Sequence, residues 1–263
     1  MAETEESNLV AVVGKGGVGK TAFAAMMSKV LIGNEAAGNL LLIDADPAKG
    51  LVVALDTEVN RTMGEVREDI IAASRGATNE EKQQLGEMID YMVLEALTEH
   101  ENYGLLAMGR SESKGCFCPV NTILRGMIEE LSGNFDTILI DGEAGVEQIN
   151  RQVMRRVDTL IIISDATSRG LRTASLVKQM VEEEGVIECG RVGLVLNRVQ
   201  GNEALVAEAA EQVGVEIFGF IPQDEQIAYH DLIGKPLTEL PPDSPAITAV
   251  REIVERRVLA AHG

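Results

Sequence analysis

The residues of this chain that are best suited to chemistry form a glycine-rich run, Gly14-Lys-Gly-Gly-Val-Gly-Lys-Thr21. The run fits the pattern G-x-x-x-x-G-K-[ST], in which successive backbone N–H groups surround phosphate oxygens. An apolar run before it and a helical pattern after it predict the strand–loop–helix context that such a site needs. A plain glycine-rich turn would not require this spacing of residue types. The predicted nucleotide-binding residues here are Gly16, Gly17, Val18, Gly19, Lys20 and Thr21.

Within this loop, two side chains are expected to take part directly. Lys20 is expected to reach the terminal phosphates, and the Thr21 hydroxyl is expected to bind Mg²⁺. The glycines leave the backbone free to curl, so that successive N–H groups can point at phosphate oxygens. The predicted ligand is therefore a nucleoside triphosphate such as ATP, bound with Mg²⁺.

Two carboxylates follow apolar runs that read as buried strands. Asp46, in Asp44-Ala-Asp-Pro47, is expected to orient a water against the terminal phosphate or to hold Mg²⁺ through water. Asp141 ends the run Ile-Leu-Ile-Asp and is expected to bind the Mg²⁺ shell. Taken alone, the first motif also fits a turn with helix-capping aspartates.

Asn197 and Arg198 end a later predicted strand, and Pro222 follows another. An Asn amide both donates and accepts, so Asn197 is suited to the edge of an adenine base. Strand-end capping explains these residues about as well. Aromatic residues make up 3% of the chain and Trp is absent, which disfavours a base held by stacking.

Cys116 and Cys118 form a Cys-x-Cys pair before Pro119. Two thiolates attract a soft divalent ion, yet a structural zinc site needs four ligands. Cys189 is far away in sequence, so a two-fold dimer that brings two pairs together is the economical completion. From chemistry alone, two buried and unreactive cysteines are an equally good reading.

The elements that must position these residues alternate along the chain. Most predicted strands are continuous apolar runs, as expected of strands buried on both faces of a sheet. The alternation predicts an α/β fold, a doubly wound and mostly parallel sheet with helices on both faces and the ligand at the carboxyl ends of the strands. Predicted strands are 9–13, 40–43, 105–108, 138–140, 160–164, 192–196 and 217–221, and predicted helices include 21–32, 120–131, 171–184, 203–213 and 246–260.

We see no linker or internal repeat, so residues 1–263 are predicted to form a single domain. The acidic, polar residues 1–8 are predicted to be a disordered tail. Residues 57–101 are charged and helix-prone, and fit either a lid-like insertion or ordinary surface helices.

The formal net charge of −19 disfavours nucleic acid and anionic membrane surfaces as partners. The chain has three cysteines, and neither a secretion signal nor an apolar run long enough to cross a bilayer is apparent. A cytoplasmic location is therefore expected.

The second lysine of the loop, Lys15, resembles that of the deviant Walker A ATPases, the superfamily of nitrogenase iron protein and the MinD and ParA positioning ATPases. The resemblance covers nearly the whole chain. It implies that Lys15 reaches across a homodimer interface to the partner's nucleotide, so that Lys15, Lys20 and Asp46 are the catalytic residues.

The segment Gly115-Cys-Phe-Cys-Pro-Val-Asn121 is similar to a motif of the CooC-type ATPases, which mature nickel carbon monoxide dehydrogenase. This resemblance implies Ni²⁺ (or Zn²⁺) bound at a dimer interface, and a carbon monoxide dehydrogenase or acetyl-CoA synthase client. Phe117, Gly142 and Gln148 depart from the residues expected there, and they leave the client open. The alternatives are a MinD/ParA-like positioning ATPase without metal and an iron–sulfur carrier ATPase, although the Cys-x-x-Cys pair usual near the C-terminus of the latter is absent.

Overall fold

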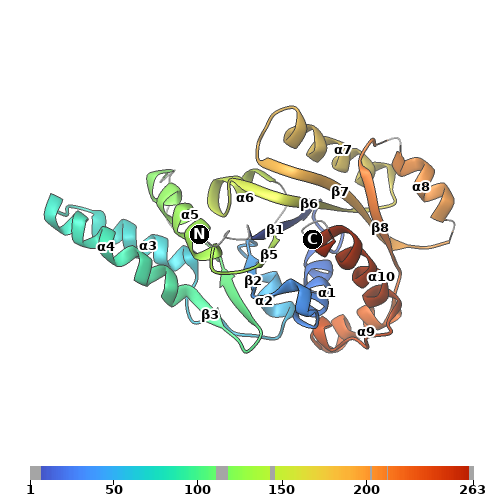
Figure 1. Cartoon of the computed structure of the whole chain (residues 1–263), viewed down its shortest axis with the longest axis horizontal. Coiled ribbons are helices and arrows are strands. Elements are labelled where there is room, and N and C mark those ends of the chain that lie inside the picture. Colours follow the sequence, from blue (N-terminus) through green and yellow to red (C-terminus); the bar gives the residue numbers. More distant parts are fainter. Residues whose placement is uncertain (1–6, 111–117, 143–145, 202, 212, 261–263) are drawn as a thin grey trace, which may run out of the picture.

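The computed structural model describes residues 7–110, 118–142, 146–201, 203–211 and 213–260. These residues build one eight-stranded sheet in the order β3-β4-β2-β5-β1-β6-β7-β8 (Figure 1). All pairings are parallel except that between β3 and β4. The predicted fold class is thereby confirmed. The strands are β1 (Asn8–Gly14), β2 (Leu40–Asp44), β3 (Leu97–Glu99), β4 (Tyr103–Ala107), β5 (Thr137–Asp141), β6 (Arg156–Asp165), β7 (Glu188–Val199) and β8 (Glu216–Pro222).

Helices cover both faces of the sheet, and each face has its own apolar core. One face carries α1 (Lys20–Ile32), α2 (Gly50–Ala54), α9 (Glu225–Ile233) and α10 (Pro245–Ile253), with the π-helical turn Val254–Leu259 after it. The other face carries α3 (Met63–Ser74), α4 (Asn79–Ala96), α5 (Cys118–Ser132), α6 (Val146–Gln152), α7 (Ser168–Glu182) and α8 (Glu203–Glu211). Two short 3₁₀ turns, Glu35–Ala37 and Leu237–Glu239, complete the described elements.

The central strands β1, β2 and β5 are buried almost throughout, because helices pack on both sides of them. This burial is why they read as continuous apolar runs in the sequence instead of alternating ones. Asn8 is a correction: we expected it in a disordered tail, but it begins β1. Its backbone N–H donates to Asp136 O at 2.8 Å, and its side chain donates to Val258 O at 3.0 Å. Residues 1–6 of that predicted tail lie outside the described residues.

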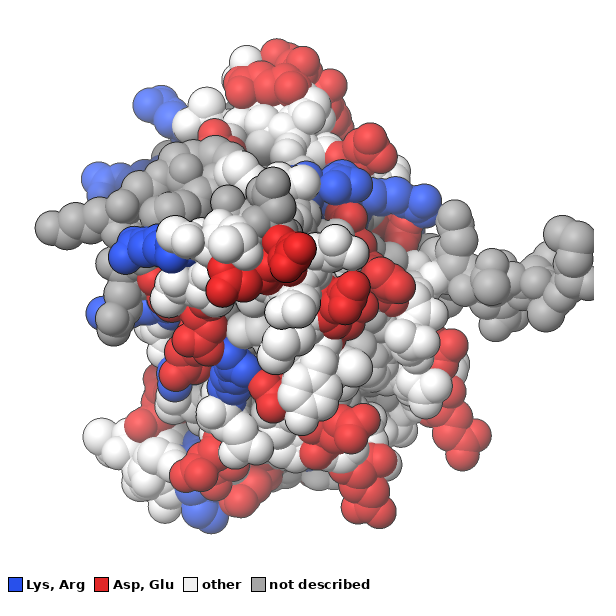
Figure 2. Space-filling view, turned by 90° about the vertical axis from the view of Figure 1, so that its left-hand side faces the viewer, with Lys and Arg blue, Asp and Glu red and all other residues white. Residues whose placement is uncertain are grey.

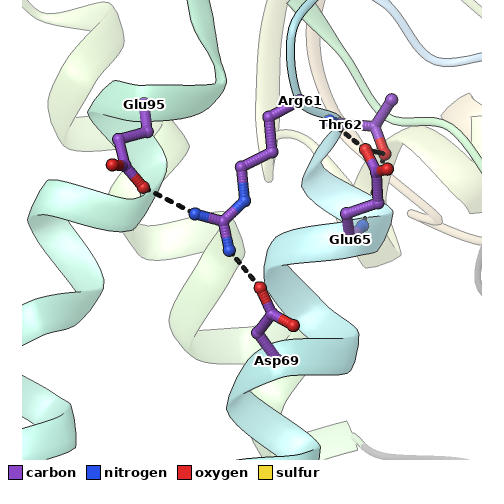
Figure 3. A network of polar contacts seen from close by, with 5 residues as sticks. All are labelled: Arg61, Thr62, Glu65, Asp69 and Glu95. Carbon is purple, nitrogen blue, oxygen red and sulfur yellow. Dashed lines mark hydrogen bonds and ion pairs between the residues drawn. The ribbon is translucent and has the colours of Figure 1, made fainter.

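The irregular region 57–101 contains the helices α3 and α4, which extend together beyond the edge of the sheet (Figure 1). Arg61 ties the two helices to each other: its guanidinium pairs with Asp69 of α3 and, at 2.6 Å, with Glu95 of α4 (Figure 3). Carboxylates are spread over this end of the molecule among fewer basic side chains (Figure 2). The short strand β3 follows and forms an antiparallel edge, which the sequence pattern did not predict.

Candidate functional site

The glycine-rich loop lies between β1 and α1, at the carboxyl edge of the central strand. Gly19 is the N-cap of α1 and has a φ of 92°, in the left-handed region that favours glycine. A Cβ on Gly19 would come within 2.4 Å of the Asn197 amide nitrogen, so any larger residue would collide there. The loop therefore presents the free N–H groups of a helix N-terminus to the neighbouring cavity, an arrangement suited to phosphate.

The two lysines of the loop are placed differently. Lys20 begins α1 and lines the cavity beside the loop, and its Nζ also donates to the Lys15 carbonyl oxygen at 3.3 Å. Lys15 is half-buried and is not among the described residues that line that cavity. Lys20 therefore lines the cavity beside the loop, whereas Lys15 is not among its described lining residues, and the contact of Lys20 with phosphate stays a prediction.

Three carboxylates gather at the same edge. Asp44 ends β2 and Asp141 ends β5, and the two residues are paired in register on these adjacent strands. Asp46 follows two residues after Asp44, and its backbone N–H donates to the Asp44 carboxylate at 3.1 Å. Asp44 also accepts the Val52 N–H at 3.0 Å, so its carboxylate holds the whole turn from β2 to α2. The sequence motif contained Asp44, but we had assigned it no role.

The Asp141 carboxyl group is fully buried, and neither of its oxygens has a hydrogen-bond partner among the described residues. Burial raises its pKa to about 7, with the Asp44 charge acting in the same direction, while the Thr21 hydroxyl, which lies near the carboxyl group without completing a hydrogen bond, and the Lys20 ammonium oppose the shift. Burial likewise raises the pKa of Asp44 to about 6. An unsatisfied buried carboxylate beside a second one is a fitting environment for a divalent cation, which would neutralise both groups. Thr21, Asp141 and, through water, Asp46 could hold Mg²⁺ here.

Asp46 itself is partly exposed and lines the cavity, where its carboxylate accepts the Ala48 N–H at 2.8 Å. The helix that follows Asp141 contacts this turn from the other side, because Gln148 of α6 donates to the Ala45 carbonyl oxygen at 3.2 Å. The turn that carries Asp46 is therefore held by two hydrogen-bonding groups, the Asp44 carboxylate and the Gln148 side-chain amide. The sequence had marked Gln148 only as a departure from a motif.

The predicted adenine contacts lie on β7 and β8. Asn197 is buried and donates its amide to the Val18 carbonyl oxygen at 2.8 Å. Arg198 has a left-handed backbone with φ 56° and lines the cavity. Pro222 ends β8 and, like Asn197, is not among the described lining residues. The structure thus uses Asn197 to hold the phosphate loop, and its contact with a base stays a prediction.

The cavity beside the loop has a volume of about 640 Å³, enough for a nucleotide. Besides Asp46 and the predicted loop residues other than Val18, which is buried, its wall includes a segment that sequence reasoning missed. This segment runs from the end of α9 to the following turn and contributes His230, Asp231 and Lys235. No motif marks it, because only the fold brings α9 next to the loop. A cavity of similar size, about 620 Å³, surrounds His100 and Tyr103 at the amino ends of the strands and contains none of the predicted residues.

The predicted metal ligands are only partly placed. Cys116 lies outside the described residues, and Cys118 is described only as the first residue of α5. Cys189 lies on β7, where its thiol donates to the Arg191 carbonyl oxygen at 3.2 Å and burial raises its pKa. Among the residues whose positions are described, no three or more His, Cys, Asp and Glu side chains are grouped closely enough to hold a metal ion by themselves, so Mg²⁺ at Asp141 would also need the Thr21 hydroxyl and water.

In the same described part of the chain, no helix is both long and apolar enough to cross a membrane.

Comparison with known proteins gives a consistent picture. Residues 9–237 match the model of the CobQ/CobB/MinD/ParA nucleotide-binding domain family. An uncharacterised ATP-binding protein of Methanocaldococcus jannaschii is 36% identical, over 94% of this chain and 97% of that protein. The carbon monoxide dehydrogenase accessory protein CooC of Rhodospirillum rubrum is 27% identical, over 89% and 90% respectively. The septum site-determining protein MinD of Pyrococcus horikoshii, solved with Mg-ADP, superposes with a TM-score of 0.66 at 23% identity, covering 98% of this chain and 99% of that one.

Proposed function

The chain belongs to the CobQ/CobB/MinD/ParA nucleotide-binding family, and we propose that within it the protein is an ATP-driven nickel chaperone that works as a homodimer. Membership of this family assigns ATPase activity to the chain. The phosphate-binding loop of the chain agrees with that assignment. The metal is the cargo, and the client is a nickel enzyme of the carbon monoxide dehydrogenase or acetyl-CoA synthase kind.

The Cys-x-Cys motif at Cys116 and Cys118 is the observation that carries this proposal. It supplies two soft ligands per chain, and two chains supply the four that a thiolate-bound Ni²⁺ or Zn²⁺ takes. The accessory protein CooC of Rhodospirillum rubrum, whose name links it to carbon monoxide dehydrogenase, matches this chain over almost its whole length.

The position of the motif in the fold also supports the proposal. The motif follows β4 and runs into α5, which begins at Cys118, and the carboxyl end of β4 lies beside that of β2. The Met108 N–H, one residue beyond β4, donates to the Asp44 carbonyl oxygen at 2.8 Å. The chain therefore leaves the sheet toward the cysteines at the edge that holds the nucleotide site, where closure of a dimer over ATP would act on both.

The runner-up is a MinD/ParA-like positioning ATPase, because that function occurs in the same family. Such a protein works on a DNA or membrane surface, which favours basic or amphipathic patches. The net charge of −19 and the carboxylates over the α3–α4 end (Figure 2) favour the chaperone instead. An iron–sulfur carrier is a third candidate, and the optical spectrum of the bound metal separates it from a nickel chaperone.

Metal binding and mass, measured on the same sample, test the proposal. Equilibrium dialysis with Ni²⁺ should give one metal per two chains, light scattering should show a dimer, and thiolate charge-transfer absorption should appear. The double variant Cys116→Ala/Cys118→Ala should bind no metal and keep basal ATP hydrolysis. Cys189→Ala is the matched control and should bind normally. Undiminished binding in the double variant, or a full metal equivalent on a monomer, would overturn the shared site.

A further inference from the structure

Helix α3 contacts residues 108–110, which follow β4 and lead toward the cysteine motif; we call this segment the stem. The Gly64 N–H, in the first turn of α3, donates to the Met108 carbonyl oxygen at 2.8 Å. The approach is close enough to require glycine, because a Cβ on Gly64 would lie 2.4 Å from the Arg110 carbonyl oxygen. Met108 in turn donates its own N–H to Asp44 O at 2.8 Å, so this stem is hydrogen-bonded to α3 on one side and to the nucleotide site on the other.

The same helix also contacts the first turn of α5, where the cysteine motif ends. One turn further along α3, the Arg67 Nε donates to the Asn121 side-chain oxygen at 2.9 Å. Asn121 lies in the first turn of α5, three residues after Cys118. The Arg67 side chain is only 9% exposed, and its Nη1 also donates to Glu68 at 2.9 Å. A charge-assisted hydrogen bond in such a buried setting fixes the separation of α3 and α5.

The first turn of α3 is well held. Thr62 and Glu65 form a capping box, in which the Thr62 N–H donates to the Glu65 carboxylate at 2.7 Å and the Glu65 N–H donates to the Thr62 hydroxyl at 3.3 Å. Arg61, just before it, ties α3 to α4 (Figure 3). A helix anchored in this way transmits a displacement of the stem to the first turn of α5 better than a mobile loop would.

Together these contacts form a continuous chain from the turn that carries Asp46 to the N-terminus of α5, through Asp44, Met108, Gly64, Arg67 and Asn121. We propose that Arg67 is a positioning residue which couples the state of the nucleotide site to Cys118 by holding Asn121. This inference rests on the proposed function for the role of the cysteine, and its own content is the coupling. It also accounts for Asn121, the polar residue of the cysteine motif that metal binding leaves unused.

Thiol reactivity measures the coupling without any metal. We would alkylate the full-length protein with a maleimide, with and without Mg-ATP, and follow each cysteine by mass spectrometry, using Cys189 as the internal reference. In the wild type, nucleotide should change the rate at Cys118 by about fivefold or more, the usual lower range of an allosteric coupling. In Arg67→Met and in Asn121→Leu, the rate should become independent of nucleotide.

Conservative variants distinguish positioning from simple loss of folding. Asn121→Asp keeps the acceptor oxygen and Arg67→Lys keeps a donor, so both should retain most of the nucleotide response. Thermal unfolding of all four variants shows whether they fold. Retention of the full response in Arg67→Met or Asn121→Leu would overturn the inference, as would a wild type whose Cys118 ignores nucleotide. Nickel titration of the same samples is a separate readout: failure of the wild type to bind nickel would refute the proposed function alone, because the thiol measurement stands without metal.

Discussion

Asp44 and Asp141 lie directly opposite each other on the adjacent strands β2 and β5, and both carboxyl groups are fully buried. Asp44 is satisfied by two backbone N–H groups, whereas Asp141 has no hydrogen-bond partner among the described residues. Two buried carboxyl groups side by side cannot both ionise cheaply without a cation between or beside them. The pair therefore makes the nucleotide site sensitive both to pH and to Mg²⁺.

We predict that the nucleotide-free protein loses stability as the pH rises. Burial raises the folded-state pKa of Asp141 from 3.8 to about 7, so the folded protein holds this proton more tightly than the unfolded chain does. The stabilisation is fully present below about pH 4 and is lost as the pH rises through 7. The Asp141 contribution should be on the order of a few kcal/mol in the free energy of unfolding.

Urea unfolding at pH 5 and pH 8 checks this, with the variant Asp141→Asn compared to the wild type. The variant should lose most of the pH dependence, and Asp90→Asn, at an exposed position on α4, should keep it. Mg²⁺ binding has the opposite sign: affinity should rise with pH through about 7, because the cation needs the ionised carboxylate. An unchanged pH slope in Asp141→Asn would contradict the prediction.

Substitutions of Lys20 and Asp46 should affect ATP binding and ATP hydrolysis separately. Lys20→Ala removes the ammonium group at the phosphate position and should abolish ATP binding in calorimetry. Asp46→Asn should leave ATP affinity within about threefold but lower the hydrolysis rate by about 10²–10⁴, the usual contribution of a group that handles the proton of the attacking water. Phosphate release measures the rate. Wild-type turnover by Asp46→Asn would eliminate the proposed role of this carboxylate.

Lys15 should act on the nucleotide of the partner subunit, since its side chain is not among the described residues that line its own cavity. Lys15→Ala should keep nucleotide affinity and lose hydrolysis. An equimolar mixture of Lys15→Ala and Asp46→Asn chains should then recover about a quarter of wild-type activity. Half of the dimers are mixed by random assortment, and each mixed dimer has one site with both residues intact. If the mixture stays as inactive as its components, Lys15 acts within its own chain.

The Arg61 bridge should contribute measurably to the α3–α4 pair because it joins two carboxylates on different helices while remaining 21% exposed. We expect Arg61→Met to lower the free energy of unfolding by about 1 kcal/mol, with salt reducing the effect. Arg256→Met is the matched control, since Arg256 pairs with Glu252 at 4.0 Å and both side chains are largely exposed. Equal effects of the two substitutions in urea unfolding would show that the bridge has no special role.

The sequence by itself determined the phosphate loop, the buried parallel strands and the acidic residues at their ends. These features are local: glycine spacing sets the loop, and burial on both faces makes the strands continuous apolar runs. All seven predicted strands occur in the structure, and Lys20 and Asp46 both line one cavity with the loop.

Tertiary structure decided the contacts between segments that no spacing rule links. The pairing of Asp44 with Asp141 depends on strand order, and the wall formed by His230 and Lys235 depends on where α9 packs. The hydrogen bond from Arg67 to Asn121 joins two residues that are 54 positions apart in the chain, and its role appears only once α3 is seen to contact the chain on both sides of the cysteines. Buried polar partners are chosen by the fold, because only folding determines which groups lose water together.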